Sequence, residues 1–261
     1  MATPLYFAVV GDHYDAFILL LEHGADPNAC YCTSSHSQFI EGNRLIIAMA
    51  DKPDFVMALI EYGAELFNKT SLLYIYRYEL DIMRLLIDHG DDINKGILRF
   101  ANSEPTIDDW PAIKLLIDRG ADINANRMMP HHDNSLLCTI CNSNIGIDAV
   151  QYLINHGADV NYTYCRGHNL ITPLISACCA NNVDVVKLLI KYGAKDATPV
   201  GGNVITALHI ACMKGNLKLV KLLVDNYDYD RWPEDATCPL DMFLHRDHTD
   251  IIAYLKSKEL L

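Results

Sequence analysis

Basic residues, long apolar runs and phosphate-binding loops are all scarce in this 261-residue chain. Its 21 lysines and arginines face 33 aspartates and glutamates, a net charge of −12, whereas binding a nucleic-acid backbone needs clustered cations. No stretch approaches the roughly 20 apolar residues of a membrane span, and residues 1–4 do not begin a secretory signal. Gly201-Gly202 is an isolated pair and not a phosphate-binding loop. We therefore expect no nucleic-acid partner, no membrane contact and no secretion.

Acidic residues are concentrated in the first half of the chain. Residues 1–130 carry 19 acidic and 10 basic side chains, and residues 131–261 carry 14 and 11. A partner steered by charge should therefore approach the first half and have a basic surface. The nine cysteines are an odd number scattered through apolar contexts, which is typical of reduced thiols. We expect a cytoplasmic protein in the cytosol, with the nucleus as the alternative location.

An apolar segment that ends in a glycine turn recurs six times. Successive turn glycines are 39, 27, 30, 37 and 36 residues apart, at Gly24, Gly63, Gly90, Gly120, Gly157 and Gly193. Apolar residues at helical spacing form a stripe for burial, and the glycine adopts the left-handed conformation that ends a helix. A shorter apolar segment precedes each glycine, and the clearest begin with a capping threonine at Thr3, Thr172 and Thr206. Each unit is predicted to be a helix pair that buries its apolar face against its neighbours.

These units resemble the ankyrin repeat, most closely in Thr172-Pro-Leu-Ile-Ser-Ala177 and Thr206-Ala-Leu-His-Ile-Ala211. The resemblance implies an all-α solenoid of about eight helix-turn-helix units with β-hairpin-like tips, in which tips and first helices line a concave face. We expect one domain over residues 1–261. Its units fall at about 1–28, 42–65, 69–94, 96–124, 134–161, 170–195, 204–228 and 237–258.

Two regions of this repeat array should differ from the rest. The units between Gly63 and Gly120 lack the Thr-Pro-Leu-His pattern and capping threonines, so local opening should cost least there. Terminal units should present a polar outer face, as Lys256, Lys258 and Glu259 do at the C-terminal end.

Cysteines and histidines are the first candidates for chemistry. Cys138 and Cys141, just after His131 and His132, have the spacing of a zinc site. However, Cys141, Cys178 and Cys212 recur at one register position of the first helix, which indicates small buried fillers. We expect no metal and no cofactor. Cys30 and Cys32 fall in an insertion and are predicted to be exposed, reactive thiols.

Three histidines recur just before turn glycines and close to aspartates, at His23, His89 and His156. As general bases they would lie one repeat apart and could not converge on one substrate. A helix C-terminus, where a partly cationic imidazole is favoured, explains them better. We predict no enzymatic activity.

Large side chains that interrupt the repeat register are candidates for protein binding, because tyrosine, tryptophan and arginine are enriched in interface hot spots. The candidate residues are Tyr31, Phe39, Arg77, Tyr78, Met128, Met129, Tyr162, Tyr164 and Trp232. Ordinary packing is the alternative for any one of them, and also for Tyr74 and Tyr76. We expect the main contact surface in the acidic half, centred on Tyr31, Phe39, Arg77 and Tyr78, with the row of Tyr162, Tyr164 and Trp232 as the competing site.

Among ankyrin proteins, the chain resembles the divergent kind found in poxviruses or intracellular bacteria, through its irregular repeat lengths and its Ile, Asn, Asp and Tyr bias over 82–94 and 148–164. This resemblance implies a monomeric protein that binds and sequesters or inhibits a host regulatory protein, as host-range and immune-modulating proteins do. The alternative is a substrate-recruiting adaptor of a larger complex such as a ubiquitin ligase. Poxviral adaptors commonly end in an F-box-like segment, for which residues 256–261 leave no room.

A further alternative is that the chain is a substrate of an asparaginyl hydroxylase that modifies ankyrin repeats. Its family-level target is an asparagine after Asp-Val or Asp-Ile with a leucine upstream, which Asn94, Asn124 and Asn161 fit. The competing explanation is that each asparagine satisfies turn backbone groups.

Overall fold

The computed structural model describes residues 3–29, 52–66, 71–125, 134–166, 169–196, 205–227, 229 and 248–260. The chain forms two compact units, which we describe separately. The first comprises residues 1–96 and 111–121, and the second comprises residues 97–110 and 122–261. The single domain over residues 1–261 stays a prediction.

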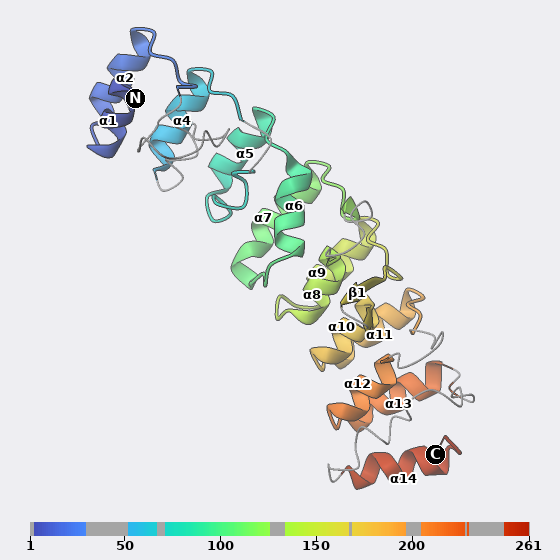
Figure 1. Cartoon of the computed structure of the whole chain (residues 1–261). Helices are drawn as coiled ribbons and strands as arrows, with labels where there is room; N and C mark the ends of the chain where they lie inside the picture. The colour runs from blue at the N-terminus through green and yellow to red at the C-terminus, as the bar shows by residue number, and fades with distance from the viewer. Residues whose placement is uncertain are drawn as a thin grey trace. The chain divides into compact units, whose positions relative to one another are not determined.

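Short helices that end in glycine turns build the first unit. They are α1 (Pro4–Val10), α2 (Tyr14–Glu22), α4 (Pro53–Glu61), α5 (Leu80–Asp88), the start of α6 (Ile93–Ala101) and most of α7 (Trp110–Asp118). The start of α1 is as predicted, because Thr3 Oγ1 accepts a hydrogen bond from the Tyr6 N–H at 3.3 Å and Pro4 opens the helix. The helices α1 and α2 lie side by side as one pair (Figure 1).

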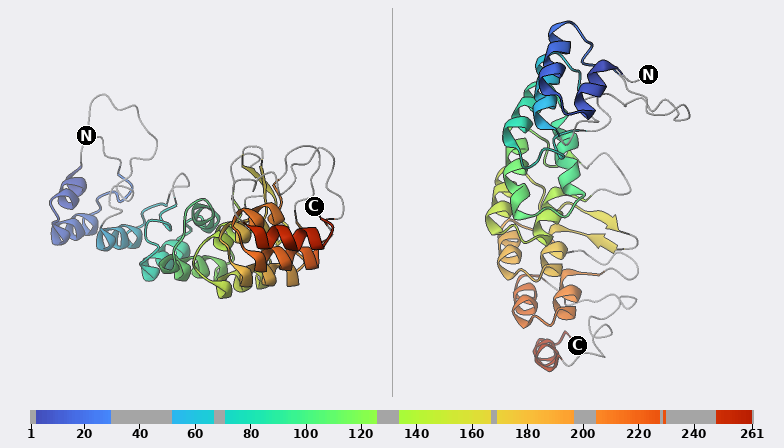
Figure 2. Two further views of the ribbon diagram at one scale, coloured as in Figure 1. Left: turned by 90° about the horizontal axis from the view of Figure 1, so that it is seen from below. Right: turned by 90° about the vertical axis from the view of Figure 1, so that its left-hand side faces the viewer.

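The second unit repeats the helix pair more regularly. After the short η1 (Ile107–Asp109) its helices are α8 (Leu136–Asn142), α9 (Ile147–Asn155), α10 (Pro173–Cys179), α11 (Val183–Lys191), α12 (Ala207–Met213), α13 (Leu217–Asn226) and α14 (Thr249–Ser257). Strands β1 (Tyr164–Arg166) and β2 (Asn169–Ile171) pair antiparallel, with Tyr164 opposite Ile171. This hairpin extends away from the neighbouring helices (Figure 2), and it forms a β-hairpin tip of the kind that the resemblance to the ankyrin repeat implies.

The six turn glycines all adopt the left-handed conformation, with φ between 78° and 90°. At Gly157 the turn is closed by two backbone hydrogen bonds, from the Gly157 N–H to Ile154 O and from the Ala158 N–H to Leu153 O, both at 3.0 Å. Carbonyl groups that would be left unpaired at the end of α9 are thereby satisfied. The predicted helix ends are confirmed.

First helices stack on one another through small and apolar side chains. The helix α10 packs closely against both α8 and α12. Cys141, Cys178 and Cys212 lie at the same register position of these three helices and are completely buried, so the prediction that they are small core fillers is confirmed. Burial also raises the pKa of Cys138 to about 12, which keeps this thiol protonated at neutral pH.

Residues 71–78 differ from the repeat pattern, because they form a series of turns where a first helix was predicted. Ten residues separate the helix caps Thr3 and His13, whereas only eight separate Ser71 from the cap residue Glu79. A two-turn helix and its connecting loop do not fit into the shorter length. The spacing of only 27 residues from Gly63 to Gly90 is the sequence signal of this deletion.

The helix starts of the irregular units differ from those of the regular ones. The helix α6 begins at Ile93, so Asn94 lies in its first turn. The expectation that these units lack a capping threonine was wrong, because Thr106 and Asp109 form a capping box at the start of η1, with the Thr106 N–H donating to Asp109 Oδ2 at 2.8 Å. The chain therefore compensates for the missing Thr-Pro-Leu-His pattern with other caps.

Candidate protein-binding surface

An arginine held between two tyrosine rings is the main feature of the shortened segment. The Arg77 guanidinium carbon lies 4.6 Å from the ring centroid of Tyr74 and 4.4 Å from that of Tyr78. Arg77 Nη1 also donates a hydrogen bond to Tyr74 O at 3.0 Å. Stacking of this kind fixes a side chain that would otherwise have many rotamers.

The two sides of this segment differ in exposure. Tyr78 is 59% exposed and Ile75 is 44% exposed, whereas Tyr76 is 2% exposed and belongs to the core. Ordinary packing, the alternative considered for Tyr76, is therefore correct for that residue. We call the outward-facing group formed by Tyr74, Ile75, Arg77 and Tyr78 the 74–78 patch.

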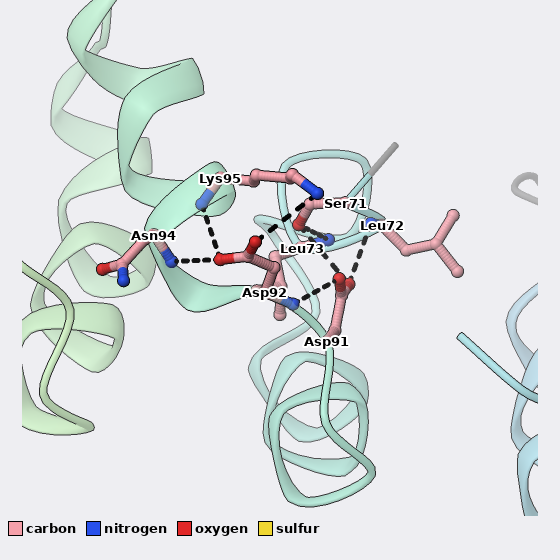
Figure 3. A network of polar contacts seen from close by, with 7 residues as sticks. All are labelled: Ser71, Leu72, Leu73, Asp91, Asp92, Asn94 and Lys95. Atoms are coloured by element: carbon pink, nitrogen blue, oxygen red, sulfur yellow. Dashed lines mark hydrogen bonds and ion pairs between the residues drawn. The ribbon is translucent and has the colours of Figure 1, made fainter. Parts of the chain in front are cut away.

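The carboxylate of Asp91 anchors the base of the 74–78 patch (Figure 3). Asp91 Oδ2 accepts hydrogen bonds from the Leu72 N–H at 2.9 Å and from Ser71 Oγ at 3.4 Å, and Oδ1 accepts one from the Asp92 N–H at 2.8 Å. Ser71 Oγ in turn accepts the Leu73 N–H at 3.3 Å. Burial of this carboxyl group raises the pKa of Asp91, partly offset by these hydrogen bonds.

Asp91 occupies a position that other repeats fill with alanine. The equivalent residues after the turn glycine are buried in four units, at Ala64, Ala121, Ala158 and Ala194. A carboxylate at this position replaces the missing helix cap of the shortened segment. The substitution is visible in the sequence as Gly90-Asp91-Asp92 in place of Gly-Ala-Asp.

The neighbouring Asp92 fixes the start of α6 in the same way. Its Oδ1 accepts the N–H groups of Asn94 at 3.0 Å and Lys95 at 3.1 Å, and its Oδ2 lies 3.5 Å from Lys95 Nζ (Figure 3). Asp91 thus holds the turn at 71–73, and the adjacent Asp92 holds the first turn of α6. This bonding gives the 74–78 patch a defined base.

Two residues of the competing tip row, Tyr162 and Tyr164, lie within the described ranges. In the second unit, the rings of Tyr162 and Tyr164 are 6.5 Å apart and both side chains are half-buried. The remaining predicted contact residues lie outside the described ranges, at Tyr31, Phe39, Met128, Met129 and Trp232. Cys30, Cys32, His131 and His132 also lie outside them.

An aromatic stack in the second unit was not anticipated from the sequence. The ring of Trp110 meets Tyr152 edge-on at 5.5 Å, and Tyr152 stacks on His156 at 4.0 Å. Gln151 Nε2 donates to the Tyr192 hydroxyl at 2.7 Å beside this stack. Trp110 begins α7 whereas Tyr152 lies near the centre of α9, so aligning the units by their glycines does not reveal this contact.

The three recurrent histidines cap helix ends. Nδ1 of His23, His89 and His156 lies 2.8 to 2.9 Å from the carbonyl oxygen four residues earlier. Each is exposed and follows the last residue of its own helix. Their interpretation as helix-end residues is confirmed, and the contacts account for their recurrence without a catalytic role.

Asparagines after the turns tie neighbouring repeats together. Asn124 Nδ2 donates to Gly157 O at 2.9 Å, and Asn124 Oδ1 accepts the Asp159 N–H at 3.0 Å. Asn161 bonds Gly193 O at 3.1 Å and the Lys195 N–H at 2.8 Å in the same way. Both side chains therefore satisfy turn backbone groups. This agrees with the explanation that competes with a modification site.

The described ranges contain neither a cluster of metal ligands nor a membrane-spanning helix. Among these residues no group of three or more His, Cys, Asp or Glu side chains is placed to hold a metal ion. In the same part of the chain no helix has the length and apolar character needed to cross a membrane.

Comparison with known proteins identifies the repeats. Models described as "Ankyrin repeat", "Ankyrin repeats (3 copies)" and "Ankyrin repeats (many copies)" match residues 2–31, 106–200 and 208–255, together about two thirds of the chain. Similar curated proteins include "Ankyrin repeat and SOCS box protein 6" from Pongo abelii and from Homo sapiens, each 29% identical over 136 residues. The alignment covers 45% of this chain and 31% of each relative, so the chain matches less than a third of those proteins.

The relatives named above are mammalian, and they give no support to the resemblance to poxviral or other pathogen proteins. The repeat models, the left-handed glycine turns and the stacked helix pairs agree with one another. The chain belongs to the ankyrin repeat family.

Proposed function

We propose that this protein is a non-enzymatic scaffold that binds another protein through the 74–78 patch. The observation that carries the proposal is the Arg77 guanidinium held between the rings of Tyr74 and Tyr78. Arginine and tyrosine are among the residue types enriched in interface hot spots. Because stacking already restricts Arg77, less side-chain entropy is lost when a partner binds.

The charge of the surroundings favours a partner with a basic surface. Glu79 and Asp81 directly follow the patch and are exposed, and the first half of the chain has a large acidic excess. Such a field accelerates encounter with a basic protein, while the stacked anchors set how long the complex lasts. We expect Tyr31 and Phe39 to contribute to the same surface, and the row of Tyr162, Tyr164 and Trp232 remains the competing site, with Met128 and Met129 as further candidates.

The proposed role is to sequester or inhibit a host regulatory protein in the cytoplasm. A stacked repeat array provides a binding surface without catalytic groups, and ankyrin repeats generally act as protein-interaction scaffolds. The viral or pathogen origin is part of this proposal and has the sequence bias over 82–94 and 148–164 as its support.

The test compares two double variants of the full chain in affinity purification from transfected cells, followed by binding measurements with the purified partner. Arg77→Ala/Tyr78→Ala removes the patch. Arg84→Ala/Tyr62→Ala removes an arginine and a tyrosine of the same unit that are also partly exposed. The proposal predicts loss of a partner only with the first pair, and equal retention by both pairs would contradict it.

An adaptor is the second candidate function. The names of the two mammalian relatives combine ankyrin repeats with a SOCS box, which is compatible with a substrate-recruiting part of a larger assembly such as a ubiquitin ligase. A sequestering protein should leave the amount of its partner unchanged in the cell, whereas an adaptor should increase the partner's ubiquitination. Measuring partner ubiquitination with and without the chain separates these two functions.

A role as hydroxylation substrate at Asn94, Asn124 or Asn161 is the third candidate. The side-chain amides of Asn124 and Asn161 are bonded to the next repeat through both oxygen and nitrogen. Hydroxylation at these two positions would therefore require local opening. Peptide mass spectrometry after incubation with an asparaginyl hydroxylase should show faster modification of short peptides than of the folded chain.

A further inference from the structure

The second helices of two neighbouring repeats, α9 and α11, carry partly exposed aromatic rings. The two helices pack against each other in the second unit (Figure 1). Tyr192 caps the end of α11 and is 39% exposed. Tyr152 on α9 and Trp110 of the interrupted unit 96–124 meet edge-on at 5.5 Å, and both are half-buried. These rings belong to second helices, whereas the ankyrin resemblance implies binding by tips and first helices.

Hydrogen bonds and stacking hold these side chains in place before any partner binds. Gln151 Nε2 donates to the Tyr192 hydroxyl at 2.7 Å and to Asn155 Oδ1 at 2.8 Å. The ring of His156 stacks on Tyr152 at 4.0 Å. A partner that covers these rings therefore freezes few additional rotamers, and the amide between α9 and α11 already has its acceptors.

Two lysines stand beside the rings on α11. Lys187 and Lys191 are one helical turn apart and both are exposed. Lys191 Nζ lies 5.9 Å from the centroid of the Tyr192 ring. Lys187 Nζ is 3.4 Å from Asp184 Oδ1, but both side chains are largely exposed. Such a surface pair contributes little free energy, so Lys187 can exchange it for another carboxylate.

The sign of this charge differs from that of the same position in the first unit. Lys191 lies two residues before the turn glycine Gly193. The corresponding residues of α2, α4 and α5 are all acidic and exposed, namely Glu22, Glu61 and Asp88. The acidic residues of α9 and α11, Asp148 and Asp184, lie in the first turns of these helices. The end of α11 next to Tyr192 is therefore basic in an otherwise acidic chain.

We propose that this surface binds an acidic amphipathic segment of another protein. We call it the α9–α11 face, and it is formed by Trp110, Tyr152, His156, Lys187, Lys191 and Tyr192. Apolar side chains of the segment pack on the rings, and its carboxylates pair with the two lysines. Charge complementarity selects this occupant. The proposal is independent of the 74–78 patch, and it gives the scaffold a second partner of opposite charge.

A single-stranded nucleic acid also combines negative charge with groups that stack on aromatic rings. It fits the α9–α11 face less well, because tracking a phosphate backbone needs a continuous row of cations. Two lysines beside an aromatic cluster instead match a short segment that has one apolar side and one acidic side. The net charge of −12 opposes a polyanion further.

Fluorescence anisotropy with the full chain and a labelled synthetic peptide tests the proposal. The peptide is helical, with leucines on one face and glutamates on the other. A second peptide has glutamine at every glutamate and is otherwise identical. The parent chain should bind the glutamate peptide at least about ten-fold more tightly than the glutamine peptide, because only the first can pair with the lysines.

Charge reversal locates the binding of the glutamate peptide. Lys187→Glu/Lys191→Glu should raise the dissociation constant at least about ten-fold. Lys256→Glu/Lys258→Glu is the matched control, since it changes the net charge equally at two exposed lysines of the second unit, on or directly after α14.

An aromatic truncation gives a second, independent variant. Tyr192→Ala should also weaken binding of the glutamate peptide at least about ten-fold if the ring is an anchor. Tyr62→Ala is its matched control, because Tyr62 is likewise 39% exposed and directly precedes a turn glycine. Melting temperatures of the four variants show whether each is folded.

Each outcome decides the proposal. Loss of affinity with both variants of the α9–α11 face, and with neither control, supports it. Any other pattern among the folded variants overturns it, as does a parent chain that does not bind the glutamate peptide or binds both peptides equally. Tighter binding of a single-stranded oligonucleotide of the same charge would overturn the assignment to a protein segment.

Discussion

At the scale of single residues, carboxylates replace the caps that irregular repeats have lost. Asp91 stands where other units have a buried alanine, and it bonds the backbone of the turn at 71–73. The cost of burying a carboxyl group, seen in the raised pKa of Asp91, is offset by three donors. A single side chain thus compensates for a missing helix.

Replacing Asp91 by alanine should destabilise the first unit. The change leaves the Leu72 and Asp92 N–H groups without their acceptor, and each such loss costs about 1–3 kcal/mol when the donor stays buried. Urea unfolding of the full chain measures the effect. Asp81→Ala is the control, since Asp81 is exposed and makes only a surface ion pair with Arg84 at 2.6 Å. Equal stability of the two variants would contradict the role assigned to Asp91.

Tyr229 gives the second unit a pH dependence at the alkaline end. Its hydroxyl donates to Asp196 Oδ2 at 2.6 Å, and burial followed by the Asp196 charge raises the pKa of Tyr229 well above 10. A folded-state pKa above the unfolded value means that the stabilisation is complete below about pH 10 and is lost as the pH rises further. Thermal melting should show that Tyr229→Phe loses less stability than the parent between pH 9 and 11. A parallel loss in both proteins would refute this linkage.

At the scale of helices, periodicity and turn glycines predicted most of the fold. The left-handed glycines, the threonine caps of α1, α10 and α12, and the buried cysteine register could all be predicted from one sequence, because each depends on local spacing. The apolar residues of segment 71–78 favoured a helix, so a first helix was predicted there. The spacing of 27 residues from Gly63 to Gly90 is too short for one, and the segment forms turns. The contact between Trp110 and Tyr152 depends on how two helices stack, which local patterns do not encode.

Candidate binding residues were predictable in type and less so in placement. Arg77 and Tyr78 stood out because they interrupt the register, but the stacking of Arg77 on Tyr74 depends on turns that were not anticipated. Similarly, Tyr76 has the same residue type as Tyr78 and lies in the core. The directions of the side chains in segment 71–78 follow from the turns that the shortened repeat forms, and not from helical spacing.

Hydrogen exchange should find the weakest helices between Gly63 and Gly120. Segment 71–78 lacks the first helix against which α5 would otherwise pack, so fewer apolar contacts must break for local opening. The amides of α5 should therefore exchange faster than those of α11 and α13, which have complete partners in α10 and α12. Slower exchange in α5 than in α11 would refute this order.

At the scale of the whole molecule, charge and structural irregularity coincide. Most of the acidic excess lies in residues 1–130, where the repeat is also most interrupted. In regular repeats, such as those built from α10 to α13, the repeat register determines which side chains are buried between neighbouring units. Fewer large side chains are therefore available to bind a partner. We therefore expect partner recognition to depend on the interrupted repeats.

Titration calorimetry with the purified partner tests this central claim most directly. The Arg77→Ala/Tyr78→Ala chain should bind more weakly by about 2 kcal/mol or more, as expected for hot-spot residues, with little change in melting temperature because Tyr78 is largely exposed. The Arg84→Ala/Tyr62→Ala chain should bind like the parent. Parental affinity of the Arg77→Ala/Tyr78→Ala chain, together with loss of binding in Trp232→Ala, would show that the surface lies elsewhere.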